Sequence, residues 1–111
     1  MQVTIETLGG MTLVTATGRL DFGAATAFQQ QLEQAIAARP ARVVVDCASL
    51  EYVSSAGLRS FLVAARAAKA ASAGFAACGL QPSVKEVFEI SGFSRIIEIL
   101  PDRAAATAAG G

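Results

Sequence analysis

The chain has 111 residues, of which 53% are hydrophobic, with nine basic and nine acidic residues. This length and content predict one domain with a core that needs no disulfide or metal. Zero net charge argues against a dedicated nucleic-acid binder, and no window approaches the roughly 20 apolar residues that span a bilayer. The N-terminus lacks the pattern of a signal peptide, so we expect a cytoplasmic protein without membrane insertion.

The first segments predict a β-hairpin followed by a helix. Val3 and Ile5 alternate with polar residues, and after Gly9 and Gly10 the alternation resumes from Met11 to Thr17, which indicates two antiparallel strands turned at the glycines. Residues 18–23 break this pattern. Asp21 is a suitable cap for a helix whose inner face would comprise Phe28, Leu32, Ala35 and Ile36.

The middle of the chain predicts a buried strand that leads into a helix. Residues 42–46 are rich in valine and lack polar alternation, as in a strand covered on both faces. After residues 54–57 an apolar helical stripe comprises Leu58, Phe61, Leu62, Ala65 and Ala68. We expect Ser54 to cap this helix, which would leave Ser55 in its first turn with a freer hydroxyl.

The last segments predict a strand, a helix and a final strand. Residues 75–78 are a short apolar strand, and the next helix ends near Gly92. Residues 96–99 read as the last strand, closed by Pro101. We therefore expect one domain over residues 1–101 and a flexible tail over 102–111, with a short helix as the alternative.

The resulting order is β-β-α-β-α-β-α-β. Strands joined through helices should be parallel by right-handed crossovers. The fold class is therefore α/β, a small sandwich with a mixed sheet covered by helices. Functional loops of such sheets gather after the strands, where Asp21, Asp46, Ser54 and Ser55 stand.

Two cysteines and the lack of histidine limit the chemistry. Cys47 and Cys78 have small apolar neighbours, so we read them as buried hydrophobes, with a redox pair as the alternative. Without histidine the chain lacks the usual base for a serine or cysteine nucleophile. Asp21 and Asp46 have no third ligand near them in the pattern, so no metal or other cofactor is expected.

The pattern resembles the STAS domain of anti-sigma-factor antagonists over most of the chain. The resemblance rests on residues 18–21, on residues 43–46 with Leu50 and Tyr52, on residues 54–58 and on residues 90–93. It implies that Ser55 is phosphorylated by an anti-sigma factor that is itself a serine kinase using Mg-ATP, and that a serine phosphatase reverses the modification. Ser54 stands where the family has an acidic residue, which makes it a competing acceptor, and Ala56 replaces a family hydroxyl.

The resemblance also implies a partner-binding surface around the serines. That surface would comprise Asp21, Asp46, Ser54, Ser55, Ala56, Gly57, Leu58 and Arg59. The alternatives are structural: Asp21 as a helix cap, Asp46 as a turn former at the end of its strand, and Arg59 as part of a solvated face.

These observations lead to one main functional hypothesis and two alternatives. The resemblance implies an anti-sigma-factor antagonist that binds the kinase when unphosphorylated, is released when phosphorylated on Ser55, and catalyses nothing itself. The first alternative is a STAS accessory subunit of a membrane transporter of the lipid ABC type, in which Ser55 has no switching role. The second is a small enzyme with Ser55 as nucleophile, which lacks a general base.

Overall fold

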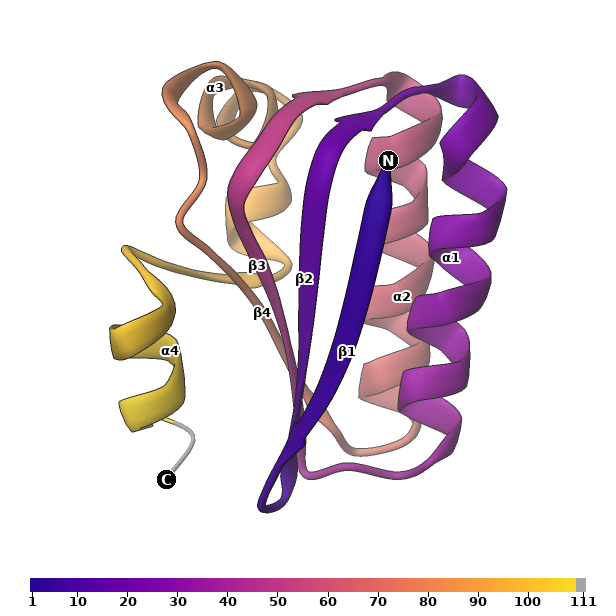
Figure 1. Cartoon of the computed structure of the whole chain (residues 1–111), viewed down its shortest axis with the longest axis vertical. Helices are drawn as coiled ribbons and strands as arrows, with labels where there is room; N and C mark the ends of the chain where they lie inside the picture. Colours follow the sequence, from indigo (N-terminus) through magenta and orange to yellow (C-terminus); the bar gives the residue numbers. More distant parts are fainter. Residues whose placement is uncertain (110–111) are drawn as a thin grey trace.

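The protein is a five-stranded sheet with helices on both faces (Figure 1), seen in a computed structural model that describes residues 1–109. The elements run β1 (Gln2–Leu8), β2 (Met11–Leu20), α1 (Phe22–Ala37), β3 (Arg42–Val53), α2 (Ser55–Ala70), β4 (Gly74–Cys78), α3 (Pro82–Ile90), the 3-10 turn η1 (Phe93–Arg95), β5 (Glu98–Leu100) and α4 (Arg103–Ala109). None of the helices within these residues is long and apolar enough to cross a membrane.

The sheet has the strand order β1-β2-β3-β4-β5. Strands β1 and β2 form the antiparallel hairpin, turned where Gly9 has a φ of 62°, and the other neighbouring strands are parallel. The predicted α/β class and mixed sheet are confirmed.

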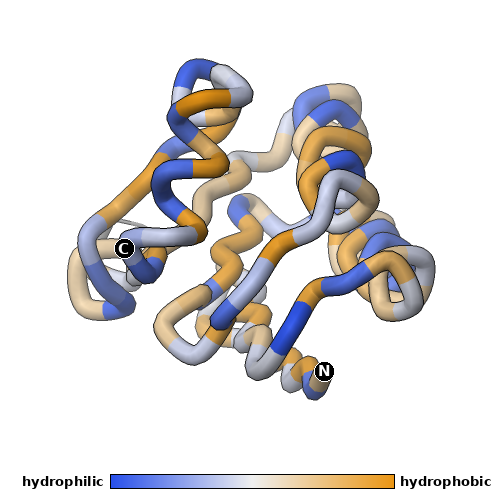
Figure 2. The backbone as a smooth tube through the Cα atoms, turned by 90° about the horizontal axis from the view of Figure 1, so that it is seen from above, coloured by the Kyte–Doolittle hydropathy of each residue, from blue (hydrophilic) through white to orange (hydrophobic). Residues whose placement is uncertain are grey.

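The main core lies between the sheet and helices α1, α2 and α3. Four aromatic rings run through it, with centroid distances of 5.3 Å for Phe28–Phe61, 5.1 Å for Phe61–Phe88 and 6.0 Å for Phe88–Phe93. Figure 2 shows hydrophobic and hydrophilic residues interleaved along the helices, as expected where one face is buried. The run of rings connects three helices and η1 into one packed unit.

The buried face of α2 is rotated slightly from the predicted stripe. Phe61 is fully buried as expected, but Leu58 and Leu62 are half-buried, and Gly57, Ser60 and Ala64 face inward instead. The reason is that α2 packs beside α1 as well as on the sheet. Small residues on that side let the two helices approach.

Three predicted strands have different limits in the structure. The second hairpin strand, expected from Met11 to Thr17, continues to Leu20. The strand expected over residues 42–46 continues to Val53, with irregular pairing to β2. The last strand begins at Glu98 because η1 precedes it, which leaves Ile96 55% exposed while Ile97 is buried.

The segment expected as a flexible tail contains helix α4, the alternative. Helix α4 lies on the face of the sheet opposite α1 and α2 (Figure 1). Ala106 is buried there against a small cluster that includes Met11, Leu13 and Val44. A polar contact adds to this packing, since Arg103 donates to Asp46 and Thr15 at 2.9 Å each. The last two residues of the expected tail lie outside the described residues.

Candidate functional site

Two helix N-termini lie side by side at one end of the sheet. Leu20 and Val53 are register partners at the ends of β2 and β3, and the Ser54 amide donates to the Leu20 carbonyl at 2.9 Å. Directly beyond these residues, the side chains of Asp21 and Ser54 cap α1 and α2. The structure therefore brings Asp21 and the serine loop together, as predicted.

The two capping side chains are each engaged in a hydrogen bond with the first turn of their helix. The Asp21 carboxylate accepts from the Ala24 amide at 3.0 Å, and the Ser54 hydroxyl accepts from the Gly57 amide at 3.1 Å. Both interactions satisfy amides that the first turn of a helix leaves unpaired. The predicted caps are confirmed.

Ser55 is placed differently from its neighbour. It is the first residue of α2, it is exposed, and within residues 1–109 its hydroxyl makes no hydrogen bond to another side chain or to the backbone. A group attached to this oxygen would lie at the positive end of the α2 dipole. Of the two adjacent serines, Ser55 is thus the one with an exposed hydroxyl that is not engaged in a cap.

Gly57 holds the loop against β2. A Cβ atom at this position would lie 2.6 Å from Cγ of Leu20 and 2.9 Å from the Leu20 carbonyl oxygen. Only glycine permits this approach without displacing the strand. Ala56 and Leu58 are half-buried on either side, so these three positions support the serines and offer little surface.

Arg59 lies one helical turn beyond Ser55 and is exposed. Residues four apart in a helix share a face, so its guanidinium is on the side of α2 that carries the free hydroxyl. A phosphate on Ser55 would have the α2 amides and this cation within the same chain.

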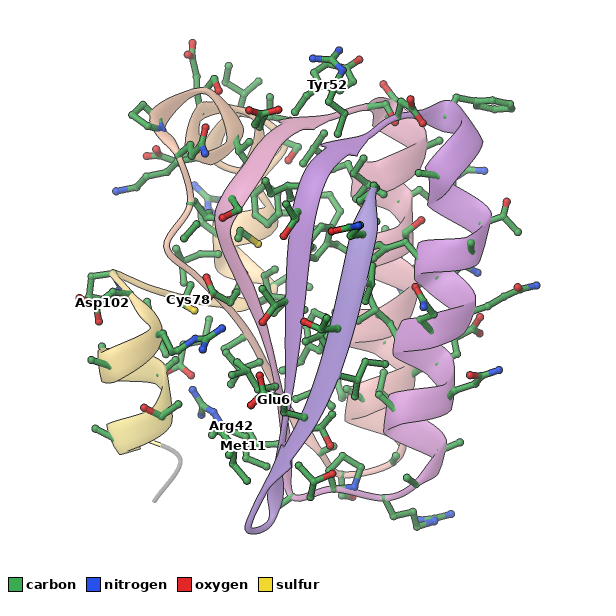
Figure 3. All side chains as sticks on the ribbon, viewed as in Figure 1. Glu6, Met11, Arg42, Tyr52, Cys78 and Asp102 are labelled. Carbon is green, nitrogen blue, oxygen red and sulfur yellow. The ribbon has the colours of Figure 1, made fainter. Side chains whose placement is uncertain are left out.

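The structure adds three exposed residues to this end of the molecule. Phe22, directly after the Asp21 cap, is 83% exposed. Tyr52 is partly exposed, and the Arg19 guanidinium lies 4.3 Å from the centroid of its ring. Figure 3 shows Tyr52 at the end of the sheet opposite Met11 and Arg42.

Sequence reasoning named none of these three residues as part of the site. A signal was present for Phe22, because it falls outside the helical stripe that begins at Phe28. An apolar ring off that stripe, next to a cap, indicates a surface residue. We define the switch surface as Asp21, Phe22, Tyr52, Ser55 and Arg59.

Asp46 does not belong to the switch surface, which corrects the prediction that it flanks the serines. Because β3 continues to Val53, Asp46 lies roughly 25 Å from Ser54 along the strand. It is buried, its Oδ1 accepts from the Ala48 amide at 3.0 Å, and its Oδ2 accepts from Arg103 Nε at 2.9 Å. Asp46 holds α4 on the sheet.

The two cysteines are buried on opposite faces of the sheet. Cys47 belongs to the main core and Cys78 to the cluster under α4, and both are free thiols. Burial raises the pKa of Cys78 to about 11 and that of Cys47 well above its ordinary range. These thiols stay protonated at neutral pH, which argues against the redox-pair alternative.

The described residues contain no group of three or more histidine, cysteine, aspartate or glutamate side chains placed to hold a metal ion. The switch surface presents one free hydroxyl, one capping carboxylate, two aromatic rings and an arginine. These groups are suited to protein binding and to modification of a serine.

Comparison with known proteins gives matches over nearly the whole chain. The sequence model of the STAS domain matches residues 2–106. A Bordetella bronchiseptica protein with the provisional name anti-sigma factor antagonist BtrV is 36% identical, over 98% of this chain and 94% of the relative.

Solved structures share the fold at lower identity. The anti-sigma factor antagonist SpoIIAA in its unphosphorylated form superposes with a TM-score of 0.83 at 19% identity, over 99% of this chain and 97% of that one. A sulfate transporter family protein from Wolinella succinogenes has a TM-score of 0.82 at 13% identity, covering 92% of this chain and 85% of its own.

Proposed function

This chain belongs to the STAS domain family, and on that premise we propose that it is an anti-sigma-factor antagonist controlled by phosphorylation of Ser55. The unphosphorylated protein binds an anti-sigma factor with serine kinase activity, which supplies Mg-ATP. The phosphorylated protein is released, and a serine phosphatase restores it. The observation that carries the proposal is the exposed Ser55 hydroxyl beside a Ser54 hydroxyl that is committed to the cap.

The switch surface suits reversible binding in its unphosphorylated form. Phe22 and Tyr52 offer aromatic area of the kind that anchors protein interfaces. Phosphate on Ser55 adds about −1.5 to −2 charges at pH 7. Arg59 offsets only part of this charge, and removing the remainder from water inside an interface is costly unless the partner supplies a further counter-charge, so the modification opposes docking.

The free protein tolerates the same phosphate. The α2 amides, the helix dipole and Arg59 all favour negative charge at this position. Ser54 sits at the family's acidic position and acts as a cap there, a task that aspartate also performs. Replacement of the acidic residue by serine is therefore compatible with the loop's structure.

Two other functions have less support. A transporter accessory subunit would use the same surface for permanent docking, and the likeness to the sulfate transporter family protein supports a shared fold alone. An enzyme with Ser55 as nucleophile would need a general base, and the chain contains no histidine to supply one.

The test of this proposal is intact-mass measurement after incubation with the cognate anti-sigma kinase and Mg-ATP. We expect one phosphate on the wild type and on Ser54→Ala, and none on Ser55→Ala. Retention of the phosphate by Ser55→Ala would assign the acceptor to another residue. No addition to the wild type would exclude phosphorylation control by that kinase.

A further inference from the structure

A basic groove lies between α2 and the residues at the end of η1. Its volume is about 410 Å³. We name it the basic groove and define it by its lining residues, which are Leu62, Ala65, Arg66, Lys69, Arg95 and Ile96. Three of these side chains are cationic and three are apolar.

The three cations have no internal counter-charge. Within residues 1–109 neither Arg66 nor Lys69 nor Arg95 lies within salt-bridge distance of a carboxylate, whereas Arg42 and Arg103 pair with carboxylates at 2.8 and 2.9 Å. Helix α2 contains no acidic residue. The groove therefore concentrates positive charge in a chain whose net charge is zero.

The apolar part of the basic groove is accessible. Ile96 is 55% exposed because η1 turns it outward, while the adjacent Ile97 enters the core. Leu62 is half-buried beside it. A partner's apolar side chain placed over Ile96 and Leu62 would remove further apolar area from water, which is favourable.

We propose that the basic groove docks an acidic segment of a partner protein. The segment's carboxylates pair with Arg66, Lys69 and Arg95, and an apolar residue between them packs on Ile96. The chemistry favours a protein segment because three apolar side chains line the concave surface together with the three cations. A nucleic acid backbone would pair phosphates with the cations but would leave the apolar lining uncovered, and a flat membrane surface would not fill a concave groove.

The basic groove begins one helical turn beyond the switch surface, since Leu62 is three residues after Arg59, and its two helical cations lie farther along α2. Arg66 lies about 16 Å along the helix from Ser55, so a partner can engage it whether or not Ser55 is phosphorylated. Failure of the phosphorylation test would leave this proposal unaffected. Failure of the peptide-binding test would likewise leave the phosphorylation proposal unaffected.

The test uses a fluorescein-labelled synthetic amphipathic peptide built from glutamate and leucine, with a lysine-leucine peptide as its control. We expect saturable binding of the acidic peptide in fluorescence anisotropy, with amide shifts in nuclear magnetic resonance confined to α2 and η1. The double variant Arg66→Glu/Arg95→Glu should weaken this binding at least tenfold, and Ile96→Ser should weaken it without any change of charge.

The matched control is Arg39→Glu/Lys85→Glu, which changes the net charge equally at exposed positions outside the groove. It should bind the acidic peptide like the wild type, and circular dichroism should show that all variants fold. Equal weakening by both double variants, or no saturable binding by the wild type, would overturn the proposal. Groove-dependent binding of duplex DNA or phosphatidylserine vesicles in preference to the peptide would also overturn it.

Discussion

Ser54 and Ser55 are adjacent residues of one type with different roles, and their positions relative to α2 explain the difference. Ser54 has the extended backbone of an N-cap, with φ −79° and ψ 171°, which directs its hydroxyl at the Gly57 amide. Ser55 has already entered the helix, and its hydroxyl points into solvent. A helix start one residue later would make Ser55 the cap and leave Ser54 outside the helix.

The cap predicts how Ser54 variants behave. Ser54→Ala leaves the Gly57 amide without its partner, so we expect a loss of about 0.5 to 2 kcal/mol in the free energy of unfolding. Ser54→Asp should be nearly neutral because aspartate also caps. Urea denaturation gives the comparison, with Ser55→Ala as the control that should change stability least. A larger loss for Ser55→Ala than for Ser54→Ala would reverse our assignment of the cap.

The switch predicts the binding of Ser55 variants. Ser55→Ala should bind the anti-sigma partner constitutively, since it removes the acceptor without adding charge. Ser55→Asp should bind about 10- to 1000-fold more weakly, or about 1.4 to 4 kcal/mol, because a carboxylate must be desolvated at the interface. Titration calorimetry measures both. Equal affinity of unmodified wild type, Ser55→Asp and stoichiometrically phosphorylated protein would rule out an electrostatic switch.

The buried thiols predict a loss of stability in alkali. The pKa of Cys78 is raised from 9.0 to about 11 in the folded chain, whereas an unfolded thiol ionises near its ordinary value. The unfolded state thus releases protons first as the pH rises, and the free energy of unfolding should fall between pH 9 and pH 11 by up to about 1.4 kcal/mol per pH unit for each such thiol.

Denaturation across this pH range measures the effect. The slope should be smaller in Cys47→Ala/Cys78→Ala than in the wild type. If the two slopes are the same, other groups cause the decline and the thiols are not protected as the fold implies.

Among the elements, α4 depends most on a contact that is distant in sequence. A seven-residue helix rich in alanine is marginal by itself. Its position on the sheet comes from burial of Ala106 and from Arg103, which reaches both Asp46 and Thr15. The Asp46 carboxylate in turn depends on that arginine for its counter-charge.

We expect Arg103→Ala to release α4 and to lower the free energy of unfolding by about 1 to 3 kcal/mol. The reason is that the buried Asp46 carboxylate loses a charged partner. Because the Arg103 side chain is partly exposed, solvent screens the ion pair, and the loss is smaller than for a fully buried pair. Thermal melting measures the stability. Faster amide hydrogen exchange of residues 103–109 would show that α4 has left the sheet. Arg103→Ala/Asp46→Asn should recover part of the loss. Unchanged exchange in Arg103→Ala would show that the ion pair does not hold the helix.

At the scale of the whole molecule, the aromatic run through the core joins the helices to one another. Phe61 is fully buried at its centre and contacts the rings of Phe28 and Phe88. Its removal would leave a cavity that rigid neighbouring elements cannot close. The stability of the molecule therefore depends strongly on this residue.

Phe61→Ala should cost about 3 to 5 kcal/mol in the free energy of unfolding, a large part of the stability of a domain of this size. Phe22→Ala is the matched control, because the same change at an 83% exposed ring should leave stability nearly unchanged while weakening the anti-sigma partner's binding. Chemical denaturation of the two variants gives the midpoints to be compared. Similar midpoints for both would contradict the packing described for α2.

The sequence alone was enough to predict the features that depend on neighbouring residues. The hairpin, the order of the elements and the two caps follow from alternation, helical spacing and the preferences of individual residues. The distinction between Ser54 and Ser55 was also predicted, because it depends on where one helix begins. The family resemblance likewise rests on short segments, chiefly residues 18–21 and 54–58.

Only the tertiary structure decided which distant residues meet. The Asp46–Arg103 pair joins residues 57 positions apart, so no local pattern could assign Asp46 to α4 instead of the serine loop. The outward turn of Ile96 depends on how η1 packs, and the basic groove exists because that turn brings Ile96 and Arg95 beside α2. Local preferences determine the elements, whereas the burial of side chains between those elements determines which residues share a surface.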